Sequence, residues 1–450
     1  MEELVSFLLV SANVGSIFED PENLLKTWLK EFLMVVKRSD PKFLALHCQE
    51  VGGKYSKDSM KLVEEFVRAL MTSEELHHFG QIRLFLDENF TDSAKYTALG
   101  NLYFVHNSLK DVQIWDFIEN KFKSAAGKEV HNGNIEDVGT KEKVKFPLML
   151  FPESKLSRKG FMRTRWRVGC AVFDLVNIHL FHDACNFTAI EKFPSRYSEV
   201  RQTALVYTFQ RFNQGNERVP LFIFGDFNFR LDTKGLVQKL TKKAIPVYVK
   251  SAKNELEKIL YKDKLNEDKV VLTVGKKYFE LDDHEATFAG NEKWLQEYDK
   301  EPKPFEKDLF EFEISFPPSY PYNEDTSGTS YMRTRCPSWC DRIFLSRSAL
   351  SLVNMNPLEN GKPPVLYELV GEGMGVGDHK PVMLLCSLRC YPGESHRALR
   401  NEYKTERSGS TNSELRNLNH LVHDHLKNHQ VTSKIIIKSE CQHFGYKYVY

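Results

Sequence analysis

Two stretches place acidic, amide and histidine side chains where apolar runs end. In FIFGDFNFRLD, Asp226 and Asn228 follow a buried-strand pattern, and in VNIHLF, Asn177 and His179 have the same spacing of two. Residues two apart on a strand share a face, so each pair is predicted to point to one side. A carboxylate beside an amide can orient water and hold a phosphate oxygen. An Asx turn at Asp226 is the competing interpretation.

Further polar residues stand at similar positions. Asn13 ends LLVSAN, Glu50 ends FLALHCQE, and Asp378 and His379 precede an apolar run in GDHKP. A carboxylate at the end of a core strand is costly to bury unless a cation or donor meets it. Taken alone, however, Glu50 fits an ordinary surface carboxylate and Asn13 a turn. Either Asp378, through a bulge at the preceding glycine, or Asp226, across strands, could pair with His379.

Basic side chains cluster in two segments, SRKGFMRTRWR with Lys159 and YMRTRCPSWCDRI with Arg342. The arginine fork suits bidentate phosphate contacts, and two clusters suit a ligand with several phosphates. A solvated edge is a weaker alternative for Arg342, which precedes an apolar run. Arg230 shares the alternating face of the Asp–Asn pair and is a further phosphate candidate, although Asp232 could pair with it.

Together these residues supply carboxylates, amides, histidines and arginines, without a serine or thiolate nucleophile motif. Such a set suits metal-assisted phosphoester hydrolysis, because Mg²⁺ prefers carboxylate, water and phosphate oxygens. Acceleration of phosphate monoester hydrolysis approaches ~10²¹-fold, so neutralised charge and an aligned water must supply most of the effect.

Strands are the elements expected to position these groups. Apolar, β-branched or aromatic runs that end in polar clusters indicate strands at residues 8–13, 43–50, 171–181, 221–228, 339–345 and 379–386. Amphipathic stretches at 21–36 and 197–213 indicate helices. Because strands outnumber convincing βαβ repeats, stacked sheets with helices outside are favoured over a doubly wound sheet.

Two segments differ from this pattern. Residues 234–307 are rich in Lys and Glu, with a helical pattern through Asn254 to Lys264, and are predicted to form a helical insertion or lid. Residues 391–450 are polar and are predicted to be a flexible tail. Its histidines in HLVHDHLKNH are more consistent with a surface helix than with metal binding.

Composition bounds the remaining possibilities. The 450 residues carry a formal net charge of +1, which gives no global attraction to nucleic acid or membrane, and 41% are hydrophobic. The start lacks the basic flank of a secretory signal, and no apolar run approaches the ~20 residues of a membrane span. We therefore expect a cytoplasmic protein. Eight cysteines are too sparse for a disulfide framework. Zinc binding by Cys336 and Cys340, or by Cys386 and Cys390, is a minor alternative.

Three motifs, GDFNFRLD, PSWCDRIF and GDHKPV, resemble those of the inositol polyphosphate 5-phosphatases. The wider similarity, including ALHCQEVGGK and ISFPPSYPYNED, is to the type I members and covers roughly residues 5–390. The resemblance implies an α+β fold, a two-sheet, mainly antiparallel β-sandwich flanked by helices. It also implies a catalytic domain over residues 1–390 and membership of the exonuclease, endonuclease and phosphatase superfamily.

The resemblance further implies roles for individual residues. Glu50 would ligate Mg²⁺ with Asn13 nearby, Asp226 would orient or deprotonate the attacking water, Asn228 would contact the scissile phosphate, and His179 would stabilise phosphate charge. Asp378 and His379 would complete the catalytic network, while Trp339, Asp341 and Arg342 would shape the site. The expected substrate contacts are Lys159, Arg342, Asn177, Arg230 and Tyr320.

Tyr320 is followed by Pro321, where lipid-directed relatives have a lysine. The missing cation favours soluble Ins(1,4,5)P3 and Ins(1,3,4,5)P4 as substrates of a monomeric enzyme that does not bind nucleic acid. Type I members end in a prenylation box, whereas this sequence ends in KYVY, so peripheral attachment to the plasma membrane is left open. A nuclease or sphingomyelinase, disfavoured by PSWCDRI, and an inactive inositol phosphate binder, disfavoured by the water-orienting carboxylate, are the alternatives.

Overall fold

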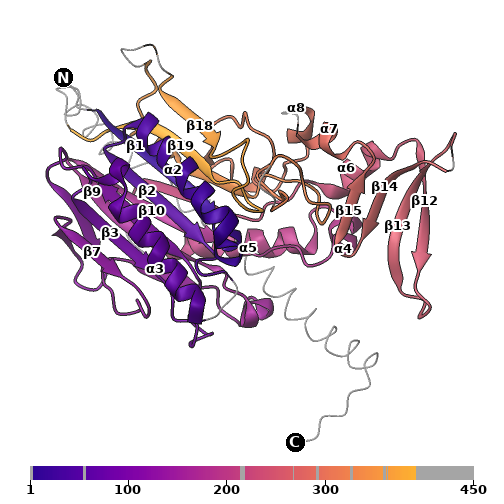
Figure 1. Ribbon diagram of the computed structural model, residues 1–450, viewed down its shortest axis with the longest axis horizontal. Helices are drawn as coiled ribbons and strands as arrows, with labels where there is room; N and C mark the ends of the chain where they lie inside the picture. Colours follow the sequence, from indigo (N-terminus) through magenta and orange to yellow (C-terminus); the bar gives the residue numbers. More distant parts are fainter. Residues whose placement is uncertain are drawn as a thin grey trace, which may run out of the picture. The chain divides into compact units, whose positions relative to one another are not determined.

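The computed structural model describes residues 4–53, 57–212, 218–266, 268–289, 293–324, 328–357, 361 and 363–391 (Figure 1). Contacts divide the chain into two units, Met1–Tyr391 and Pro392–Tyr450. The predicted tail from residue 392 onward lies outside the described residues.

One large sheet contains seven strands: β1 (Leu4–Asn13), β2 (Phe43–Gln49), β3 (Gln81–Leu86), β4 (Gly100–Val105), β7 (Lys128–His131), β18 (Val365–Leu369) and β19 (Val382–Arg389). Their order is β18-β19-β1-β2-β4-β3-β7. The β1–β2 and β3–β7 pairs are parallel, and the other pairs are antiparallel.

The second large sheet contains β5 (Val112–Asp116), β6 (Lys121–Ser124), β8 (Glu142–Lys145), β9 (Gly160–Val168), β10 (Ala171–His179), β11 (Leu221–Asp226), β16 (Leu309–Phe310) and β17 (Asp341–Ser346). Its order is β16-β17-β11-β10-β9-β5-β6, with β8 beside β9, and β10–β11 is its parallel pair. The six runs predicted as strands are β1, β2, β10, β11, β17 and β19, so these predictions are confirmed.

The helices are α1 (Gly15–Glu19), η1 (Pro21–Leu25, a π-helix), α2 (Lys26–Ser39), α3 (Lys57–Thr72), η2 (Glu74–Leu76), η3 (Pro152–Leu156), α4 (Asn186–Glu191), α5 (Arg196–Phe212), α6 (Thr233–Leu240), α7 (His284–Phe288), α8 (Lys293–Gln296), η4 (Lys303–Phe305) and α9 (Arg347–Leu350). Both predicted helices occur, the first as η1 followed by α2 and the second as α5.

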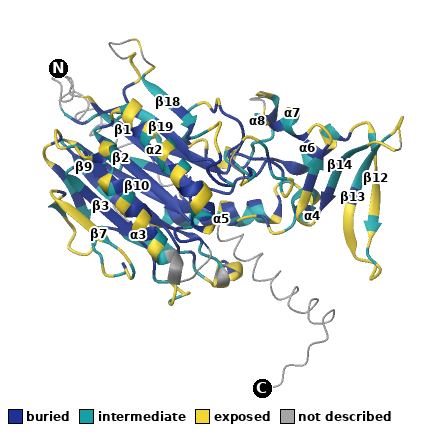
Figure 2. Ribbon diagram, in the orientation of Figure 1, coloured by how far each residue is buried: buried dark blue, intermediate teal, exposed yellow. Residues whose placement is uncertain are grey.

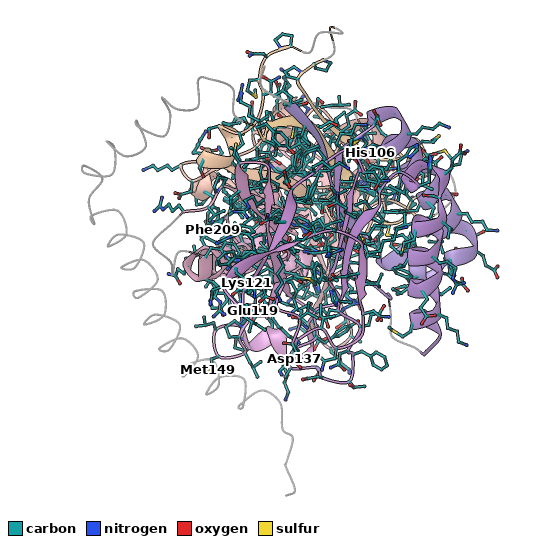
Figure 3. All side chains as sticks on the ribbon, turned by 90° about the vertical axis from the view of Figure 1, so that its left-hand side faces the viewer. His106, Glu119, Lys121, Asp137, Met149 and Phe209 are labelled. Carbon is teal, nitrogen blue, oxygen red and sulfur yellow. The ribbon has the colours of Figure 1, made fainter. Side chains whose placement is uncertain are left out.

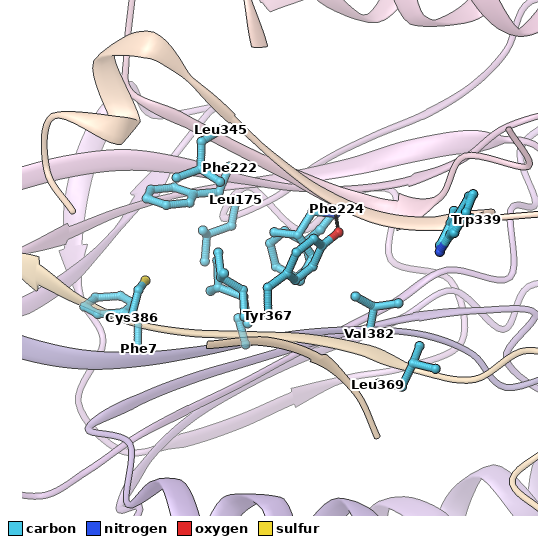
Figure 4. Packing of buried hydrophobic residues seen from close by; sticks show 14 of the residues in the cluster. Phe7, Leu175, Phe222, Phe224, Trp339, Leu345, Tyr367, Leu369, Val382 and Cys386 are labelled. Atoms are coloured by element: carbon cyan, nitrogen blue, oxygen red, sulfur yellow. Dashed lines mark hydrogen bonds between the residues drawn. The ribbon is translucent and has the colours of Figure 1, made fainter. Parts of the chain in front are cut away.

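The two large sheets pack face to face through apolar side chains. Phe7 from β1 meets Phe173 from β10 at a ring separation of 5.5 Å, and Phe222 and Phe224 belong to the same cluster (Figure 4). Because side chains alternate along a strand, the residues between these positions point to the outer faces. The predicted two-sheet sandwich is therefore confirmed.

Helices cover the outer faces of the sandwich. Trp28 and Phe32 of α2, with Phe66 of α3, belong to the apolar cluster of one sheet, while Leu205 of α5 belongs with Ile223 to that of the other. Figure 1 shows α2 and α3 over the face of the first sheet, and Figure 3 shows the helices beside the sheets from the side. The apolar face of each helix is thereby buried away from water. This burial stabilises the helix more than the helix propensity of its residues does. The result is a layer of helices on each side of two sheets.

Residues 234–307 correct the helical prediction. Four antiparallel strands form a third sheet there, in the order β12 (Ala244–Lys250), β13 (Leu256–Asp263), β14 (Val270–Gly275) and β15 (Tyr278–Leu281). Only the short helices α6, α7 and α8, and the turn η4, accompany it among the described residues. The segment predicted to be helical, 254–264, is mostly β13.

Tertiary packing explains the error. The register aligns Tyr248, Ile259, Val274 and Phe279 across the sheet, and the last three are buried. This alternating apolar face, rich in β-branched residues, stabilises strands although the Lys and Glu spacing of β13 also fits a helix. Among the described residues, no helix combines the length and apolarity needed to cross a membrane.

Buried ion pairs connect the insertion to the sandwich. Arg201 of α5 contacts Glu301 through Nε and Oε2 at 2.8 Å and also pairs with Asp183. Lys300 donates to Asp232, the side-chain cap of α6, at 2.7 Å. Both ends of the insertion are therefore held beside the end of β11.

Gly225 in β11 provides a test of this packing. A Cβ there would lie 1.9 Å from the carbonyl oxygen of Ile178 on β10, a backbone atom that cannot move aside. We predict that Gly225→Ala lowers the free energy of unfolding by roughly 3 kcal/mol or more, measured by urea denaturation. Gly373→Ala, where a Cβ meets nothing within 4 Å, is the control. Equal stability of the two variants would contradict the parallel β10–β11 pairing.

Candidate active site

Three polar residues lie in one row across the second large sheet. The register pairs His179 at the end of β10 with Asp226 at the end of β11, and pairs Asp226 with Asp341 at the start of β17. Residues paired in register share a face, so the three side chains converge. The polar ends of the strands therefore meet at a single edge, although each follows a buried apolar run.

Asp226 is the most heavily bonded group of this row. Its Oδ1 accepts from the Asn228 backbone N–H at 2.8 Å, and its Oδ2 accepts from Asn228 Nδ2 at 2.9 Å and Asn13 Nδ2 at 3.2 Å. His179 Nε2 lies 3.2 Å from the same Oδ2. Burial alone would raise the pKa of Asp226, but the charge of His379 and the bond from His179 hold it far below its ordinary value.

Asn228 shows that both interpretations of the DFN motif are correct in part. β11 ends at Asp226, and Asn228 has a positive φ of 51°, in the left-handed region that Asn tolerates. The Asx turn is therefore real, and the predicted two-residue strand alternation is wrong at this point. The turn itself brings the Asn228 amide back onto the Asp226 carboxylate.

The first large sheet contributes Asn13 and Glu50 from the ends of β1 and β2. Glu50 has a φ of 58°, an unusual backbone conformation that turns its side chain away from the strand. A Cβ on Gly15 would lie 3.2 Å from Glu50 Oε2 and 3.5 Å from Asn13 Oδ1, so these two oxygens converge beside a glycine. Arg158 Nη2 pairs with Glu50 Oε2 at 2.9 Å.

The charges around Glu50 keep it ionised. Burial alone would raise its pKa, but chiefly the charges of Arg158 and Lys159 lower it to about 2. The pKa of Lys159, which contacts His179 Nε2, is lowered by burial to about 8. Burial and the Lys159 charge also lower the pKa of His179, so its imidazole is neutral at pH 7.

His379 is paired with Asp341. Its Nδ1 lies 2.9 Å from Asp341 Oδ2, which also accepts from Ser319 Oγ at 2.8 Å. Burial alone would lower the pKa of His379, but the charges of Asp341, Asp226 and Asp378 raise it to about 10. His379 is therefore an imidazolium at neutral pH, held between carboxylates.

Sequence reasoning missed this pairing. It considered Asp378 and Asp226 as partners of His379, whereas Asp378 Oδ1 accepts from Ser16 Oγ at 2.9 Å and fixes the start of α1. The signal for Asp341 was present in WCDRIF, where a carboxylate begins an apolar strand. Which carboxylate faces His379 depends on the antiparallel β11–β17 register, and one sequence does not reveal that.

Arg230 and Tyr320 lie together near this centre. Arg230 Nη2 donates to Asn228 Oδ1 at 2.8 Å, and its guanidinium lies 4.5 Å from the centre of the Tyr320 ring. The Tyr320 ring is 4.4 Å from the imidazole of His379. Among the described residues, Arg230 Nε and Nη1 are buried without a hydrogen-bond partner. These nitrogens can donate to an anionic ligand.

The structure contradicts the predicted phosphate contact of Arg342. Arg342 follows Asp341 on β17 and therefore points to the opposite face. Its Nη1 pairs with Asp299 at 2.8 Å and its Nε with Glu311 at 2.7 Å, and only 2% of its side chain is exposed. Arg342 is a buried structural cation rather than a ligand contact.

Asn177 is also absent from the site, although it was predicted to contact substrate. It lies two residues deeper in β10 than His179, between the two sheets. Its Nδ2 donates to Cys48 O, Gly100 O and Asn101 Oδ1 at 3.0, 3.1 and 2.9 Å, and its Oδ1 accepts from Gln49 at 2.8 Å. Because both ends of the amide are occupied, Asn177 joins the sheets and does not bind ligand.

The oxygen-rich part of the site fits a divalent cation. The Glu50 and Asn13 oxygens converge beside Gly15, and Asp226 adjoins them through Asn13. Ligand atoms of Asp226, Asp341 and His379 also lie within 4.8 Å of one another. Hard cations such as Mg²⁺ prefer carboxylate and amide oxygens, so Glu50, Asn13 and Asp226 suit one better than the protonated His379 does.

Comparison with known proteins agrees with this geometry. Residues 118–307 and 289–385 match the Endonuclease/Exonuclease/phosphatase family 2. Inositol polyphosphate-5-phosphatase A of Homo sapiens is 48% identical over 389 residues, which cover 86% of this chain and 93% of that protein. The probable type I inositol 1,4,5-trisphosphate 5-phosphatase of Caenorhabditis elegans is 34% identical over 417 residues, covering 85% and 99%.

Among solved structures, the inositol polyphosphate 5-phosphatase domain of SPsynaptojanin, in complex with inositol (1,4)-bisphosphate and calcium ion, matches with a TM-score of 0.46. It has 15% sequence identity, over 92% of this chain and 93% of that one. The sequence relatives cover 86% and 85% of this chain. The chain therefore belongs to the inositol polyphosphate 5-phosphatases of the endonuclease/exonuclease/phosphatase family and is a phosphoric monoester hydrolase.

Proposed function

We propose that this enzyme uses Mg²⁺ to remove the 5-phosphate of soluble inositol polyphosphates, converting Ins(1,4,5)P3 to Ins(1,4)P2 and Ins(1,3,4,5)P4 to Ins(1,3,4)P3. It would act as a cytoplasmic monomer and end the calcium signal that the trisphosphate carries. The Caenorhabditis elegans relative, named for inositol 1,4,5-trisphosphate, supports the substrate. The observation that carries the proposal is the buried, ionised Asp226 surrounded by nitrogen donors.

Asp226 orients the attacking water in this proposal. A carboxylate whose pKa is lowered so far is a weak base, which supports alignment of water over early removal of its proton. The bonds from Asn13 and Asn228 fix the carboxylate plane, so the water it accepts has a defined direction toward phosphorus. Such positioning supplies a large part of phosphoryl transfer catalysis.

Cationic and neutral donors bind the phosphate oxygens. The His379 imidazolium and the Lys159 ammonium contribute charge at neutral pH, and the Asn228 amide and neutral His179 add hydrogen bonds. Because these groups are buried, their attraction for transition-state charge is stronger than in water. Ser16 and Asp378 bond to each other rather than to the phosphate, and this bond fixes the start of α1.

Glu50 and Asn13 would hold the divalent cation, with Asp226 beside them. When bound, the cation supplies charge neutralisation on the scissile phosphate and polarises its bond to the leaving oxygen. Arg158, which pairs with Glu50 and donates to Gly53 O, would hold the Glu50 carboxylate in place for the cation.

Specificity for a soluble polyphosphate is supported by the Tyr320 side of the site. Arg230, beside Tyr320, has buried nitrogens available for a phosphate away from the scissile one. Pro321 provides no cation at the following position. The proposed recognition therefore depends on arginine and on the tyrosine face.

We predict that the full chain with Mg²⁺ releases phosphate from Ins(1,4,5)P3, and that Asp226→Asn lowers kcat by about a thousandfold, because the amide cannot orient water as a carboxylate does. Phosphate release and product identity are measured with Ins(1,4,5)P3, Ins(1,3,4,5)P4 and a 5-phosphorylated inositol lipid. Preferred hydrolysis of the lipid would refute the soluble substrate. Full activity after metal chelation would refute the Mg²⁺ requirement.

The Lys159 ammonium predicts a particular pH dependence. Its lowered pKa of about 8 means that the charge is present below pH 8 and is lost above it. We expect kcat/KM, which reports the free enzyme, to fall above about pH 8. In Lys159→Arg the fall should shift to higher pH, because arginine stays charged. The comparison uses one substrate, so the substrate's own ionisation cancels. An unchanged profile would show that Lys159 does not bind phosphate.

Arg230 and Arg342 are predicted to differ in their effects. Arg230→Met should raise KM by roughly tenfold to a hundredfold, the loss expected for a charged hydrogen bond. Arg342→Met should lower the free energy of unfolding by roughly 3 kcal/mol, since Asp299 and Glu311 lose their buried partner, while KM of the folded enzyme stays unchanged. Steady-state kinetics and urea denaturation of both variants make the comparison. If KM rose for Arg342→Met and not for Arg230→Met, Arg342 rather than Arg230 would be the residue that binds substrate.

A further inference from the structure

In the third sheet Ile259, Val274 and Phe279 cover a buried face, which ends at β12, where Tyr248 in register with Ile259 is 62% exposed. Ile245 and Val247 on the opposite face are exposed by 49% and 39%, and Figure 2 colours β12 and β13 mostly as intermediate or exposed. The register places Val247 beside Leu260 of β13 and then Thr273 of β14. An apolar strip on an exposed sheet face, bordered by charged residues, is typical of a surface that binds another surface.

Lysines border this strip. Lys258 and Lys262 alternate with Leu260 on the same strand face, and Lys276 and Lys277 form the β14–β15 turn. A hollow of about 570 Å³ lies among Lys258, Leu260, Thr273, Gly275, Lys276, Lys277, Tyr278, Glu257 and Glu280. Glu280 is neutralised by Arg333, so lysine charge dominates the rim. We call the residues of the strip and the rim the lysine face.

The surrounding segment is strongly basic. Eleven lysines and five acidic residues lie between Lys239 and Lys277, a net charge of +6 in a chain whose formal net charge is +1. Among the described residues of this segment, Lys269 is the lysine that forms an ion pair, with Asp282 at 2.8 Å. Lys239 lies over the Trp294 ring, and Lys250 and Lys264 donate to neighbouring oxygens. Lys258, Lys276 and Lys277, which line the hollow, are placed to attract an anionic surface.

The lysine face is attached to segments that border the active site. Asn186, seven residues after His179, donates from Nδ2 to the carbonyl oxygens of Gly275 and Tyr278 at 3.2 and 3.0 Å. It also donates to Thr334 O at 3.0 Å, close to PSWCDRI. The hollow is thus held by the strand connection that follows the catalytic histidine.

Charge and strand chemistry exclude two other occupants. A second copy would bring its own lysine face, and the like charges would repel. An added strand would have to pair with β12 or β15, the two outer strands. Pro246 at the centre of β12 lacks an N–H and Lys250 ends that strand, while the Phe279 N–H of β15 already donates to Arg333 O. A surface with negative charge and an apolar interior, into which Ile245 and Val247 can insert, fits both the lysines and the apolar strip.

We propose that the lysine face docks this enzyme on a bilayer that contains anionic lipids. The lysines bind lipid phosphates and carboxylates, and the apolar strip enters the interface between head groups and acyl chains. The docked enzyme holds its active site near the membrane surface while hydrolysing soluble substrate. Docking is independent of turnover, so its failure leaves the proposed reaction intact.

The test is vesicle co-sedimentation of the full chain. The vesicles are phosphatidylcholine alone and phosphatidylcholine mixed with phosphatidylserine. We expect binding only to the mixed vesicles, weakening between about 0.1 M and about 1 M salt. The triple variant Lys258→Glu/Lys276→Glu/Lys277→Glu should bind at least about tenfold more weakly. The control, Lys26→Glu/Lys30→Glu/Lys37→Glu on exposed positions of α2, has the same net charge and should bind as the wild type does.

Hydrolysis of Ins(1,4,5)P3 by both triple variants should equal that of the wild type, which shows that they are folded. Ile245→Ser/Val247→Ser should reduce the binding that remains at high salt. Equal loss of vesicle binding in the two triple variants would overturn the proposal, because net charge alone would then explain binding. Binding of a single-stranded RNA oligonucleotide in place of the vesicles would overturn it in favour of a nucleic-acid surface.

Discussion

The buried carboxylate of Asp226 is the constraint on which this site depends. An ionised carboxylate in a protein interior is tolerated only where donors replace the water it loses. Here the donors come from different strands: Asn13 from one sheet, His179 from the other, and Asn228 from the turn that follows. The two sheets must therefore meet at their polar edge with their strands in register, and the Phe-rich core between them fixes that meeting.

Positive and negative side chains alternate around Asp226. The charge of its neighbours therefore determines whether each titratable group is protonated. His379 lies among carboxylates and is held cationic, whereas His179 lies beside Lys159 and is held neutral. Two histidines of the same intrinsic pKa thus have different roles because their neighbours differ in sign. Asp341 contributes most to this division, since its charge does more than that of Asp226 or Asp378 to raise the pKa of His379 against the effect of burial.

Much of this could be predicted from sequence. Apolar runs with Asn13, Glu50, His179 and Asp226 at or near their ends predicted both the strands and the residues that meet, because a polar residue near the end of a buried strand requires a partner. The pairing of His379 with Asp341 could not be predicted, since it depends on register. The third sheet was mistaken for helices, because the Lys and Glu spacing of β13 fits both periods and only its packing face decides between them.

The contrast between Arg230 and Arg342 shows what sequence chemistry lacks. Both follow polar motifs, and both are buried, yet Arg342 meets Asp299 and Glu311 while Arg230 retains nitrogens without partners. A buried arginine whose charge is already matched by carboxylates stabilises the fold, and adding a phosphate there would only compete with them. A buried arginine with unmatched nitrogens is costly to the free enzyme, and that cost is recovered when an anionic substrate binds. Residue type thus identifies candidates for phosphate binding, and the unmatched charge distinguishes among them.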